Sequence, residues 1–339
     1  MTRQVRAVVV DRPGSHRLVT GPAAEPAPGE ARVAVAAAGL CASDRELYEG
    51  TRAEGYVRYP VVPGHEWSGT VEAVGEGVPA ALVGRRVVGE GFRNCLVCDR
   101  CREGATTLCT GGYEETGFTL PGAFADVLTL PARLLHTLGD DADPAAAALL
   151  EPAAVAAAAV LAGGPATAAR VAVVGAGTLG LLAVQLLAAA SPAELLVVDP
   201  RVGRAEQALT MGATAALSPA DAVAAHGAAD LVVETAGAPS TAADACLLAR
   251  RGGRVVLTGM FEAGAHGIDP VHLSVSQLTV SSVFGAPPAA WTHAVRAFRA
   301  GLLDPGPLIT HEFALTQFAE AVALVGSGRP EVGKVLLRP

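Results

Sequence analysis

The sequence is poor in aromatic residues and in charge. Aromatic side chains make up 4% of its 339 residues and charged ones 17%, whereas 51% of the residues are hydrophobic. This hydrophobic fraction excludes an intrinsically disordered chain. Much of it is alanine, which packs in little space and favours helices, so the low aromatic content indicates alanine-rich helices and not a deficient core. At about 100–200 residues per domain, the length predicts two domains.

Clusters of lysine and arginine are also missing, and the formal net charge is −8. An acidic surface repels phosphate backbones, so we expect no nucleic-acid partner. Residues 1–11 lack the basic segment, the hydrophobic run and the cleavage site of a secretory signal. We therefore expect a cytoplasmic, reducing location, where the six cysteines are free thiols or metal ligands.

One uncharged stretch, residues 171–190, has the length of a membrane span. Glycines at positions 175, 177 and 180 and prolines at 152 and 165 argue against a membrane helix, as does the alanine-dominated sequence before the stretch. We therefore expect no membrane partner.

The two parts of the sequence differ in pattern. Residues 1 to about 147 contain short β-rich runs, such as 32–37 and 69–74, between glycine and proline turns. From about 148, buried strands alternate with helices, which predicts a parallel sheet covered on both faces. The predicted strands are 170–174, 195–199, 213–217, 230–234, 254–258 and 278–283, and the predicted helices are 178–190, 201–211 and 240–250. The tail contains a helix over 288–300, a segment 313–326 and a final strand over 334–337.

A glycine-rich turn joins the first of these strands to the first helix. In such a turn Gly175 permits the tight bend, Gly177 lets the backbone approach a pyrophosphate, and Gly180 lets the helix pack on the sheet. The helix begins at Thr178, and its first turn, with Thr178 and Leu179, offers unpaired backbone amides to the phosphate. The pattern predicts a dinucleotide site, with a glycine-rich turn that binds nothing as the alternative.

Asp199 ends the next predicted strand, 22 residues beyond Gly177. A carboxylate there binds the adenosine ribose hydroxyls and repels a 2′-phosphate, which favours NAD over NADP. Arg201 and Arg204 are close enough in sequence to oppose that preference, and we include Arg204 among the candidate cofactor-binding residues.

Four thiols lie within fifteen residues, at Cys95, Cys98, Cys101 and Cys109. This spacing suits tetrahedral zinc. In bacterial ferredoxins the fourth cysteine follows after three residues and precedes proline, but here the gap is seven and Thr110 follows, so zinc is favoured over iron and sulfur. Four protein ligands leave no position for a substrate, so a structural zinc lobe is predicted over about 93–112. A zinc-ribbon module for nucleic acid is the alternative, which the lack of basic residues weakens.

A second possible metal site combines Cys41 and His65 with the carboxylates of Asp44, Glu66 and Glu151. One thiolate, one imidazole and several carboxylates are the ingredients of an open, catalytic zinc site. Taken singly, each has a simpler explanation, because a lone cysteine is usually a small buried hydrophobe and a lone histidine after a turn is usually a polar loop residue.

The motifs, in this order along nearly the whole chain, resemble those of the zinc-containing medium-chain dehydrogenases, which include alcohol, sorbitol and threonine dehydrogenases. The matching motifs are Gly39-x-Cys41-x-Ser43-Asp44, Gly64-His65-Glu66, the four-cysteine lobe, Glu151-Pro152, the glycine-rich turn and Gly333-Lys334-Val335. The resemblance implies an α/β fold with a GroES-like β-rich catalytic domain over 1–147 and 287–339 and an inserted Rossmann NAD-binding domain over 148–286. It also implies a homo-dimer or homo-tetramer, with zinc, alcohol and NAD held between the domains.

The resemblance implies that Cys41 and His65 bind the catalytic zinc, with Glu66 and Glu151 as candidates for the remaining position. Classical alcohol dehydrogenases have a second cysteine where Glu151 stands, and glutamate there is typical of the sorbitol and threonine branches. Which carboxylate binds zinc at rest stays open. Asp44 is expected to accept a hydrogen bond from the free ring nitrogen of His65.

Three further residues receive roles from the resemblance. Ser43 would relay the proton of the alcohol, and the backbone near Ser282 to Phe284 would meet the nicotinamide. Glu46 departs from the family pattern, since sorbitol and threonine dehydrogenases usually carry histidine at that position. The change affects either the proton relay or the substrate pocket.

The expected activity is oxidation of a polar secondary alcohol, with hydride transfer to NAD and two zinc ions per chain. Polar residues over 45–58 favour a hydrophilic substrate such as a polyol, an amino alcohol or an aminocyclitol, and an amine would follow if Glu46 paired with an ammonium. The alternatives are a dehydrogenase of L-threonine or a 3-hydroxy acid, a zinc-free quinone or enoyl reductase, and a non-catalytic NAD- or zinc-binding protein.

Overall fold

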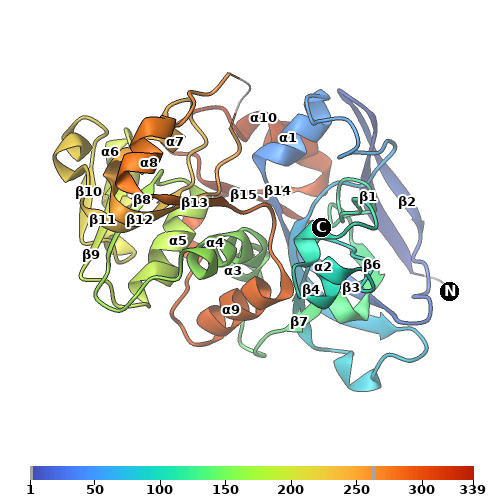
Figure 1. The fold of residues 1–339 in the computed structure, drawn as a ribbon. Helices are drawn as coiled ribbons and strands as arrows, with labels where there is room; N and C mark the ends of the chain where they lie inside the picture. Colours follow the sequence, from blue (N-terminus) through green and yellow to red (C-terminus); the bar gives the residue numbers. More distant parts are fainter. Residues whose placement is uncertain (1–2, 262–263) are drawn as a thin grey trace. The chain divides into compact units, whose positions relative to one another are not determined.

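The computed structural model describes residues 3–261 and 264–339, and the chain forms two compact units. The first unit comprises Met1–Glu151 and Pro305–Pro339, and the second Pro152–Asp304. The blue and the red ends of the chain therefore share one unit (Figure 1).

A seven-stranded sheet organises the first unit, in the order β14-β15-β3-β4-β5-β7, with β6 paired to β3. β3 is central and antiparallel to β4, β6 and β15. Its residues alternate between buried and partly exposed positions, because successive side chains point to opposite faces. β1 and β2 form a separate hairpin. The strands are β1 (Gln4–Arg12), β2 (Ser15–Pro22), β3 (Glu30–Leu40), β4 (Glu66–Val74), β5 (Arg86–Gly89), β6 (Val127–Pro131), β7 (Leu135–Thr137), β14 (Ile309–Ala314) and β15 (Lys334–Arg338).

Short helices connect these strands. They are α1 (Ala42–Glu49), α2 (Asp99–Arg102), α3 (Pro144–Ala148) and α10 (Phe318–Leu324), with 3-10 turns η1 (Ala80–Leu82), η2 (Thr106–Leu108), η3 (Ala132–Leu134), η5 (Gly306–Leu308) and η6 (Leu315–Gln317). The few aromatic residues are concentrated where they fill most volume, because Trp67, Phe118, Phe124 and Phe318 are all buried in the core of this unit.

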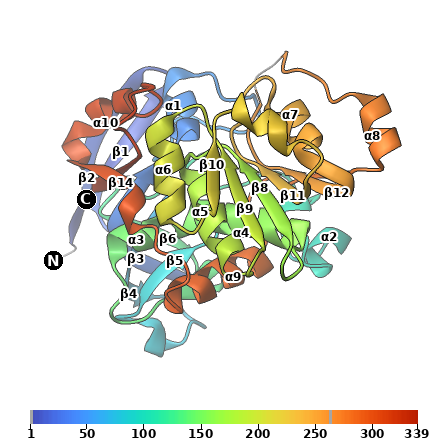
Figure 2. The same cartoon turned by 90° about the vertical axis from the view of Figure 1, so that its left-hand side faces the viewer.

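The second unit contains a six-stranded parallel sheet in the order β10-β9-β8-β11-β12-β13. From β8 the chain passes through β9 to β10 at one edge of the sheet. It then returns to β11, on the other side of β8, and continues through β12 to β13 at the opposite edge. Right-handed crossovers therefore put α5 and α6 on one face and α7 and α8 on the other. The elements are α4 (Leu150–Gly163), β8 (Arg170–Val174), α5 (Thr178–Ala188), β9 (Glu194–Val198), α6 (Val202–Thr210), β10 (Ala215–Leu217), η4 (Asp221–Ala225), β11 (Ala229–Glu234), α7 (Thr241–Leu248), β12 (Ala249–Leu257), α8 (Pro270–Ser276), β13 (Thr279–Ser282) and α9 (Pro288–Arg299). Figure 2 shows α6 beside β10 and α8 beside β12.

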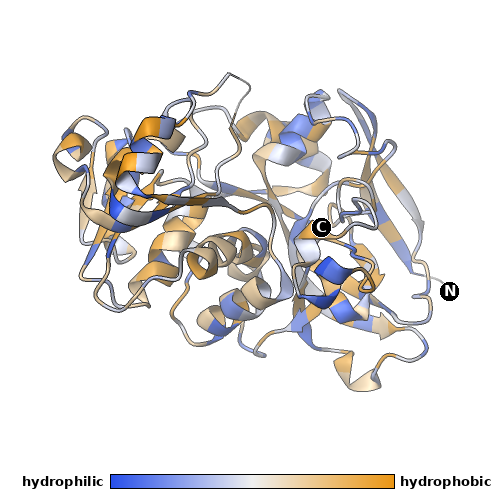
Figure 3. Cartoon of the chain, viewed as in Figure 1, coloured by the Kyte–Doolittle hydropathy of each residue, from blue (hydrophilic) through white to orange (hydrophobic). Residues whose placement is uncertain are grey.

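The uncharged stretch 171–190 forms β8 and α5, both largely buried. Figure 3 shows α4 and α5 mostly in hydrophobic colours. Within 3–261 and 264–339, no helix is long and apolar enough to cross a membrane. Cys246, on α7, is 1% exposed, and burial raises the pKa of its thiol to about 11.

The structure confirms the parallel sheet and differs from the sequence prediction at the ends of the second unit. The chain enters this unit within α4 and leaves it after Asp304, so α9 belongs to it and not to the first unit. Ala290, Trp291 and Ala294 bury one face of α9. The segment 313–326 is not one element: it begins in β14 and contains the short α10, because the backbone of Phe313 and Ala314 pairs with β15.

Candidate active site and metal centres

The junction of β3 and α1 brings a thiol and a carboxylate together. Cys41 is the N-cap of α1, with an extended backbone (φ −114°, ψ 164°). Asp44, in the first turn, is completely buried and accepts a hydrogen bond from the backbone N–H of Cys41 at 2.9 Å. A carboxylate at that position satisfies an amide of the helix start and interacts favourably with the positive end of the helix dipole. Its other oxygen, Oδ1, lies 3.4 Å from Nδ1 of His65.

His65 immediately precedes β4 and is 5% exposed. Burial disfavours the imidazolium, but Asp44 and Cys41 outweigh this effect, and the pKa of His65 is raised overall. Because Nδ1 faces Asp44, the other ring nitrogen remains for a ligand. Asp44 therefore faces the ring nitrogen of His65 at 3.4 Å, but the two atoms do not form the predicted hydrogen bond in this structure.

The ligand atoms of Cys41, His65 and Glu66 all lie within 4.8 Å of one another. A thiol, an imidazole and a carboxylate are ligands that zinc accepts, and three protein ligands leave a position for substrate. The residues present therefore fit a catalytic zinc ion. This group includes three of the four predicted ligands.

Glu151, the fourth predicted ligand, lies at the start of α4 and outside this group. Burial is the main reason why its pKa is raised to about 8, and the negative charges of Glu66 and Glu115 add to the increase, while His65 opposes it. Its carboxyl group thus interacts electrostatically with the site.

Glu66 has a cationic partner that the sequence analysis missed. Lys334 donates a hydrogen bond to Oε1 of Glu66 at 2.5 Å, and their side chains are 6% and 1% exposed. The sheet explains the contact: Gly39 of β3 pairs with Glu66 of β4 on one side and with Leu336 of β15 on the other. A Cβ at Gly39 would collide with Glu66 and press on Lys334, so glycine leaves the path of the ion pair open.

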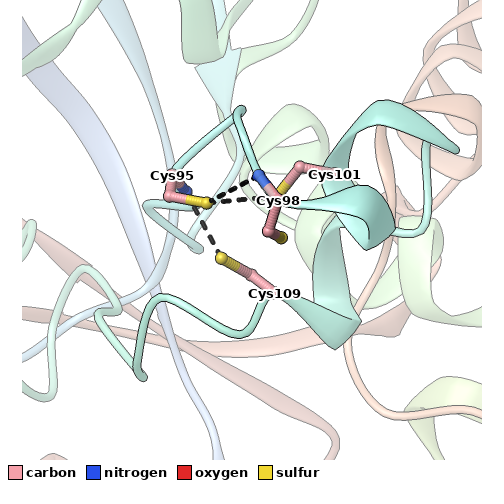
Figure 4. A group of neighbouring side chains, drawn as sticks. All are labelled: Cys95, Cys98, Cys101 and Cys109. Carbon is pink, nitrogen blue, oxygen red and sulfur yellow. Dashed lines mark hydrogen bonds between the residues drawn. The ribbon is translucent and has the colours of Figure 1, made fainter.

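The four cysteines of the predicted zinc lobe converge (Figure 4). All four sulfur atoms lie within 4.8 Å of one another, and those of Cys95 and Cys101 are 4.0 Å apart. Backbone amides point at the sulfurs, from Cys98 to Cys95 at 3.4 Å and from Gly111 to Cys109 at 3.3 Å. Amide donors stabilise thiolates, and those of Thr110 and Cys101 lower the pKa of Cys98 to about 5. The lobe fits a structural zinc ion with four thiolate ligands.

The glycine-rich turn of the second unit has the geometry expected for it. Gly175 has a left-handed backbone (φ 99°), and a Cβ at Gly180 would collide with the carbonyl oxygen of Gly175. At Gly177, by contrast, a Cβ would meet no described atom within 4 Å. The turn is thus close-packed beneath α5 and open at the start of the helix, near Thr178 and Leu179, where a pyrophosphate would bind.

Asp199 follows β9 and is 4% exposed. Its carboxylate accepts four hydrogen bonds: one from the backbone N–H of Ala176 at 2.7 Å and three from Arg201, through its backbone N–H, Nε and Nη2, at 2.8–2.9 Å. These donors lower the pKa of Asp199 although burial opposes ionisation. Arg204 lies on α6, and Phe284 follows β13 and is 47% exposed.

Comparisons with known proteins agree with this geometry. Residues 27–140 match the model of the alcohol dehydrogenase GroES-like domain, and residues 178–300 match that of the zinc-binding dehydrogenase family. The chain is 31% identical to L-threonine 3-dehydrogenase of Bacillus subtilis strain 168 over 326 residues, 91% of each protein. It belongs to the zinc-containing medium-chain dehydrogenases.

Solved structures of such dehydrogenases superpose closely on this one. One, described as a zinc-binding dehydrogenase from Sinorhizobium meliloti 1021 bound to NADP, is 28% identical, with a TM-score of 0.91 over 99% of this chain and 100% of the other. Another, described as the short chain alcohol dehydrogenase rspB of Escherichia coli CFT073 complexed with NADH, is 29% identical, with a TM-score of 0.91 over 99% of both chains. This dehydrogenase is therefore an oxidoreductase that uses zinc and a nicotinamide dinucleotide.

Sequence reasoning also missed a buried polar network next to His65. The ring of Phe118 lies 4.7 Å from the imidazole, and the guanidinium carbon of Arg52 lies 3.6 Å from the centre of the Phe118 ring. Arg52 also approaches Glu115, which is 7% exposed on its side chain, at 3.6 Å. No spacing rule identifies such a network, since Arg52 and Glu115 come from loops on either side of the zinc lobe.

Proposed function

We propose that this dehydrogenase oxidises a polar secondary alcohol to its ketone and transfers the hydride to NAD. The observation that carries the proposal is the buried group of thiol, imidazole and carboxylate at Cys41, His65 and Glu66, whose ligand atoms lie within 4.8 Å of one another. A zinc-free reductase on the same fold would have no use for these three side chains.

We propose that Cys41, His65 and Glu66 would hold the catalytic zinc, and we keep the buried carboxyl group of Glu151 as a further candidate ligand. When bound there, zinc lowers the pKa of an alcohol as a Lewis acid, and NAD accepts the hydride. The carboxylate of Glu66 also pairs with Lys334, which compensates part of its negative charge.

The residues around the ligands act on protons and orientation. Asp44 fixes the ring of His65 and its tautomer, because it faces Nδ1 and is itself tied to the amide of Cys41. Ser43, partly exposed in the first turn of α1, would receive the proton of the alcohol and pass it outward. Its place in the sequence, two residues after Cys41, supports this role.

We propose NAD as the preferred coenzyme, bound at the glycine-rich turn with its ribose on Asp199. The hydroxyls of the ribose would replace donors of Arg201, whose side chain is half exposed and free to move outward. We expect a higher kcat/KM with NAD⁺ than with NADP⁺, and Arg201→Ala should enlarge the difference because it removes a cation that attracts the 2′-phosphate. A higher value with NADP⁺ would contradict the assignment.

The main test combines a substrate screen with a single substitution. Polyols, amino alcohols and 3-hydroxy acids are screened by NADH absorbance, and we expect turnover of a polyol, an amino alcohol or an aminocyclitol. Cys41→Ser should abolish turnover and leave NAD binding, measured by calorimetry, unchanged. Activity retained by this variant would refute the catalytic zinc site, and NAD binding without any alcohol turnover by the native protein would favour a non-catalytic binding protein.

Metal analysis tests the two-zinc assignment. We expect two zinc ions per chain in the native protein and one in Cys41→Ser, because the lobe uses other ligands. If the native protein contained one zinc ion and a variant without Cys95 still contained one, the structural site would be refuted. We also propose a cytoplasmic location, which is supported by six cysteines that form no disulfide, and a homo-dimer or homo-tetramer.

A further inference from the structure

A donor and an acceptor stand beside the candidate zinc ligands without contacting each other. Oε2 of Glu46 lies 4.0 Å from Nη1 of Arg52, which is too far for a hydrogen bond. A hydroxyl oxygen between them could accept from Nη1 and donate to Oε2 at normal lengths of about 2.9 Å. We propose that Glu46 and Arg52 bind a second hydroxyl group of the alcohol substrate. This inference rests on the proposed function, because it concerns the substrate of the same reaction.

The guanidinium of Arg52 is held in place by the contacts of Nε and Nη2 and by the ring of Phe118. Nε donates to the carbonyl oxygen of Tyr56 at 2.9 Å, and Nη2 donates to the hydroxyl of Tyr113 at 3.0 Å and lies 3.6 Å from Oε2 of Glu115. One face of the guanidinium covers Phe118. Within the described part of the chain, Nη1 donates no hydrogen bond. The side chain is thus fixed, with two N–H groups available on the side that approaches Glu46.

The backbone keeps Glu46 and Arg52 at this separation. The carbonyl oxygen of Glu46 accepts hydrogen bonds from the amides of Gly50, Thr51 and Arg52 at 2.8, 2.9 and 3.3 Å. Gly50 ends α1 in the left-handed conformation (φ 80°), which turns the chain back toward the helix. The two side chains therefore leave the same tight turn, and no ordering of a distant loop is needed to bring them together.

The pair lies close to the proposed reacting centre. The centre of the Phe118 ring lies 4.7 Å from the centre of the His65 imidazole and 3.6 Å from the guanidinium carbon of Arg52. The imidazole centre and the guanidinium carbon are therefore no farther apart than these two distances added together. Glu46 follows Ser43 by three residues on α1, which puts both side chains on one face of the helix. The proposal therefore requires a substrate whose two hydroxyl groups span the distance between the metal ligands and this pair.

The chemistry of the pair selects a hydroxyl over other polar groups. A hydroxyl both donates and accepts, whereas an ammonium has no lone pair to accept from Arg52 and a carboxylate has no proton to donate to Glu46. An ammonium would also be repelled by the guanidinium, and a carboxylate by Glu46. The pair thus narrows the predicted substrates to alcohols that carry a second hydroxyl group able to reach Glu46 and Arg52 while the first is at the metal ligands. Linear polyols and cyclitols are such alcohols.

The test uses the zinc-loaded full chain and a series of small ring alcohols. kcat/KM is measured for cyclohexanol, the three positional cyclohexanediols and the matching aminocyclohexanols. We expect native protein to prefer at least one diol over cyclohexanol by about 10- to 100-fold, as for a hydrogen bond to a charged group. Glu46→Ala and Arg52→Met should each reduce this ratio about 10-fold, mainly through KM. Glu49→Ala is the matched control, because Glu49 lies on the same helix with similar exposure and pairs with Arg45.

The outcomes separate the inference from the proposed function. Oxidation of any of these alcohols by the native protein supports the proposed transfer of hydride from a secondary alcohol to NAD, whatever the ratio is. The inference is overturned if native protein does not prefer any diol, if it prefers an aminocyclohexanol over the corresponding diol, or if Glu46→Ala lowers kcat/KM equally for diol and cyclohexanol. Arg52→Met leaves Glu115 without its cation and risks misfolding, but Glu46→Ala alters a half-exposed helix position and keeps the test decisive.

Discussion

Removal of the ammonium of Lys334 should be among the most damaging single changes to the first unit. In Lys334→Met the carboxylate of Glu66 stays 1% exposed and loses its cation. Breaking a buried pair in this way costs about 3–5 kcal/mol when no other cation compensates the charge that remains. Zinc bound by Glu66 would lower this cost, as would protonation of the neighbouring His65, whose pKa is raised, so the range applies to protein without zinc at the catalytic site. We expect the loss to fall in that range.

The pH dependence of the same pair has a definite sign. Burial disfavours the charge on Lys334, yet Glu66, Cys41 and Asp44 raise its pKa overall. The stabilisation from a raised lysine pKa is complete below the pKa of the unfolded chain, about 10.4, and declines as pH rises through the folded value. The difference in stability between native protein and Lys334→Met should therefore be constant near neutral pH and shrink only in strongly alkaline solution.

The measurement is urea unfolding followed by tryptophan fluorescence. The chain has two tryptophans, and Trp291→Phe leaves Trp67, next to Glu66 and 2% exposed, as the reporter of the first unit. The catalytic site is kept free of zinc in every variant, since a ligand of the folded state shifts stability and would compensate the charge of Glu66. Arg338→Met is the control on β15, because the side chains of the Arg338–Glu312 pair are 33% and 47% exposed and the pair is expected to contribute less than about 1 kcal/mol. A loss below about 1 kcal/mol in Lys334→Met, or equal losses in both variants, would refute the reasoning.

Three further predictions concern other parts of the molecule. Asp44→Asn should weaken zinc binding at His65 by about 10- to 100-fold in a chelator competition, and unchanged affinity would exclude the orienting role. Gly180→Ala should destabilise the second unit by about 1–3 kcal/mol and weaken NAD binding in calorimetry, whereas normal stability would show that the turn can relax. Burial opposes ionisation of Asp126, but hydrogen bonds from Arg6 lower its pKa overall, so its stabilisation is present above the unfolded value and lost in acid. The stability difference between native protein and Asp126→Asn should be constant above the unfolded pKa of about 3.9 and shrink as pH falls below it, and a difference that does not shrink in acid would contradict this origin.

Much of the second unit could be predicted from the sequence. Arg170–Val174 forms β8 with the predicted bounds, and the other five strands lie at or within a few residues of the predicted positions. A strand buried on both faces is a continuous hydrophobic run, and the helix between two such strands is bounded by local turns. These are properties of neighbouring residues, which the sequence displays directly.

The first unit depends on contacts that no local pattern displays. β15 pairs with β3 across about 300 residues, and this pairing determines which side chains approach Glu66. The motifs around Cys41 and His65 predicted the metal group, because its ligands are local to two turns. The cation that pairs with Glu66 stands 268 residues away in sequence, and only the order of the strands brings it there.

The Glu66–Lys334 pair also makes the chemistry of amines in this chain unusual. Lys334 is the single lysine among the 339 residues, and its side chain is 6% exposed. An acylating reagent can modify this amine only when β15 separates from β3 or when the ion pair opens. The rate at which this lysine is modified thus reports local opening of the first unit directly, without isotope exchange. If the protein were attached to a surface through its lysine, the attached molecules would be those in which the Glu66–Lys334 pair has opened, and the proposed zinc site beside Glu66 would already be disturbed in them.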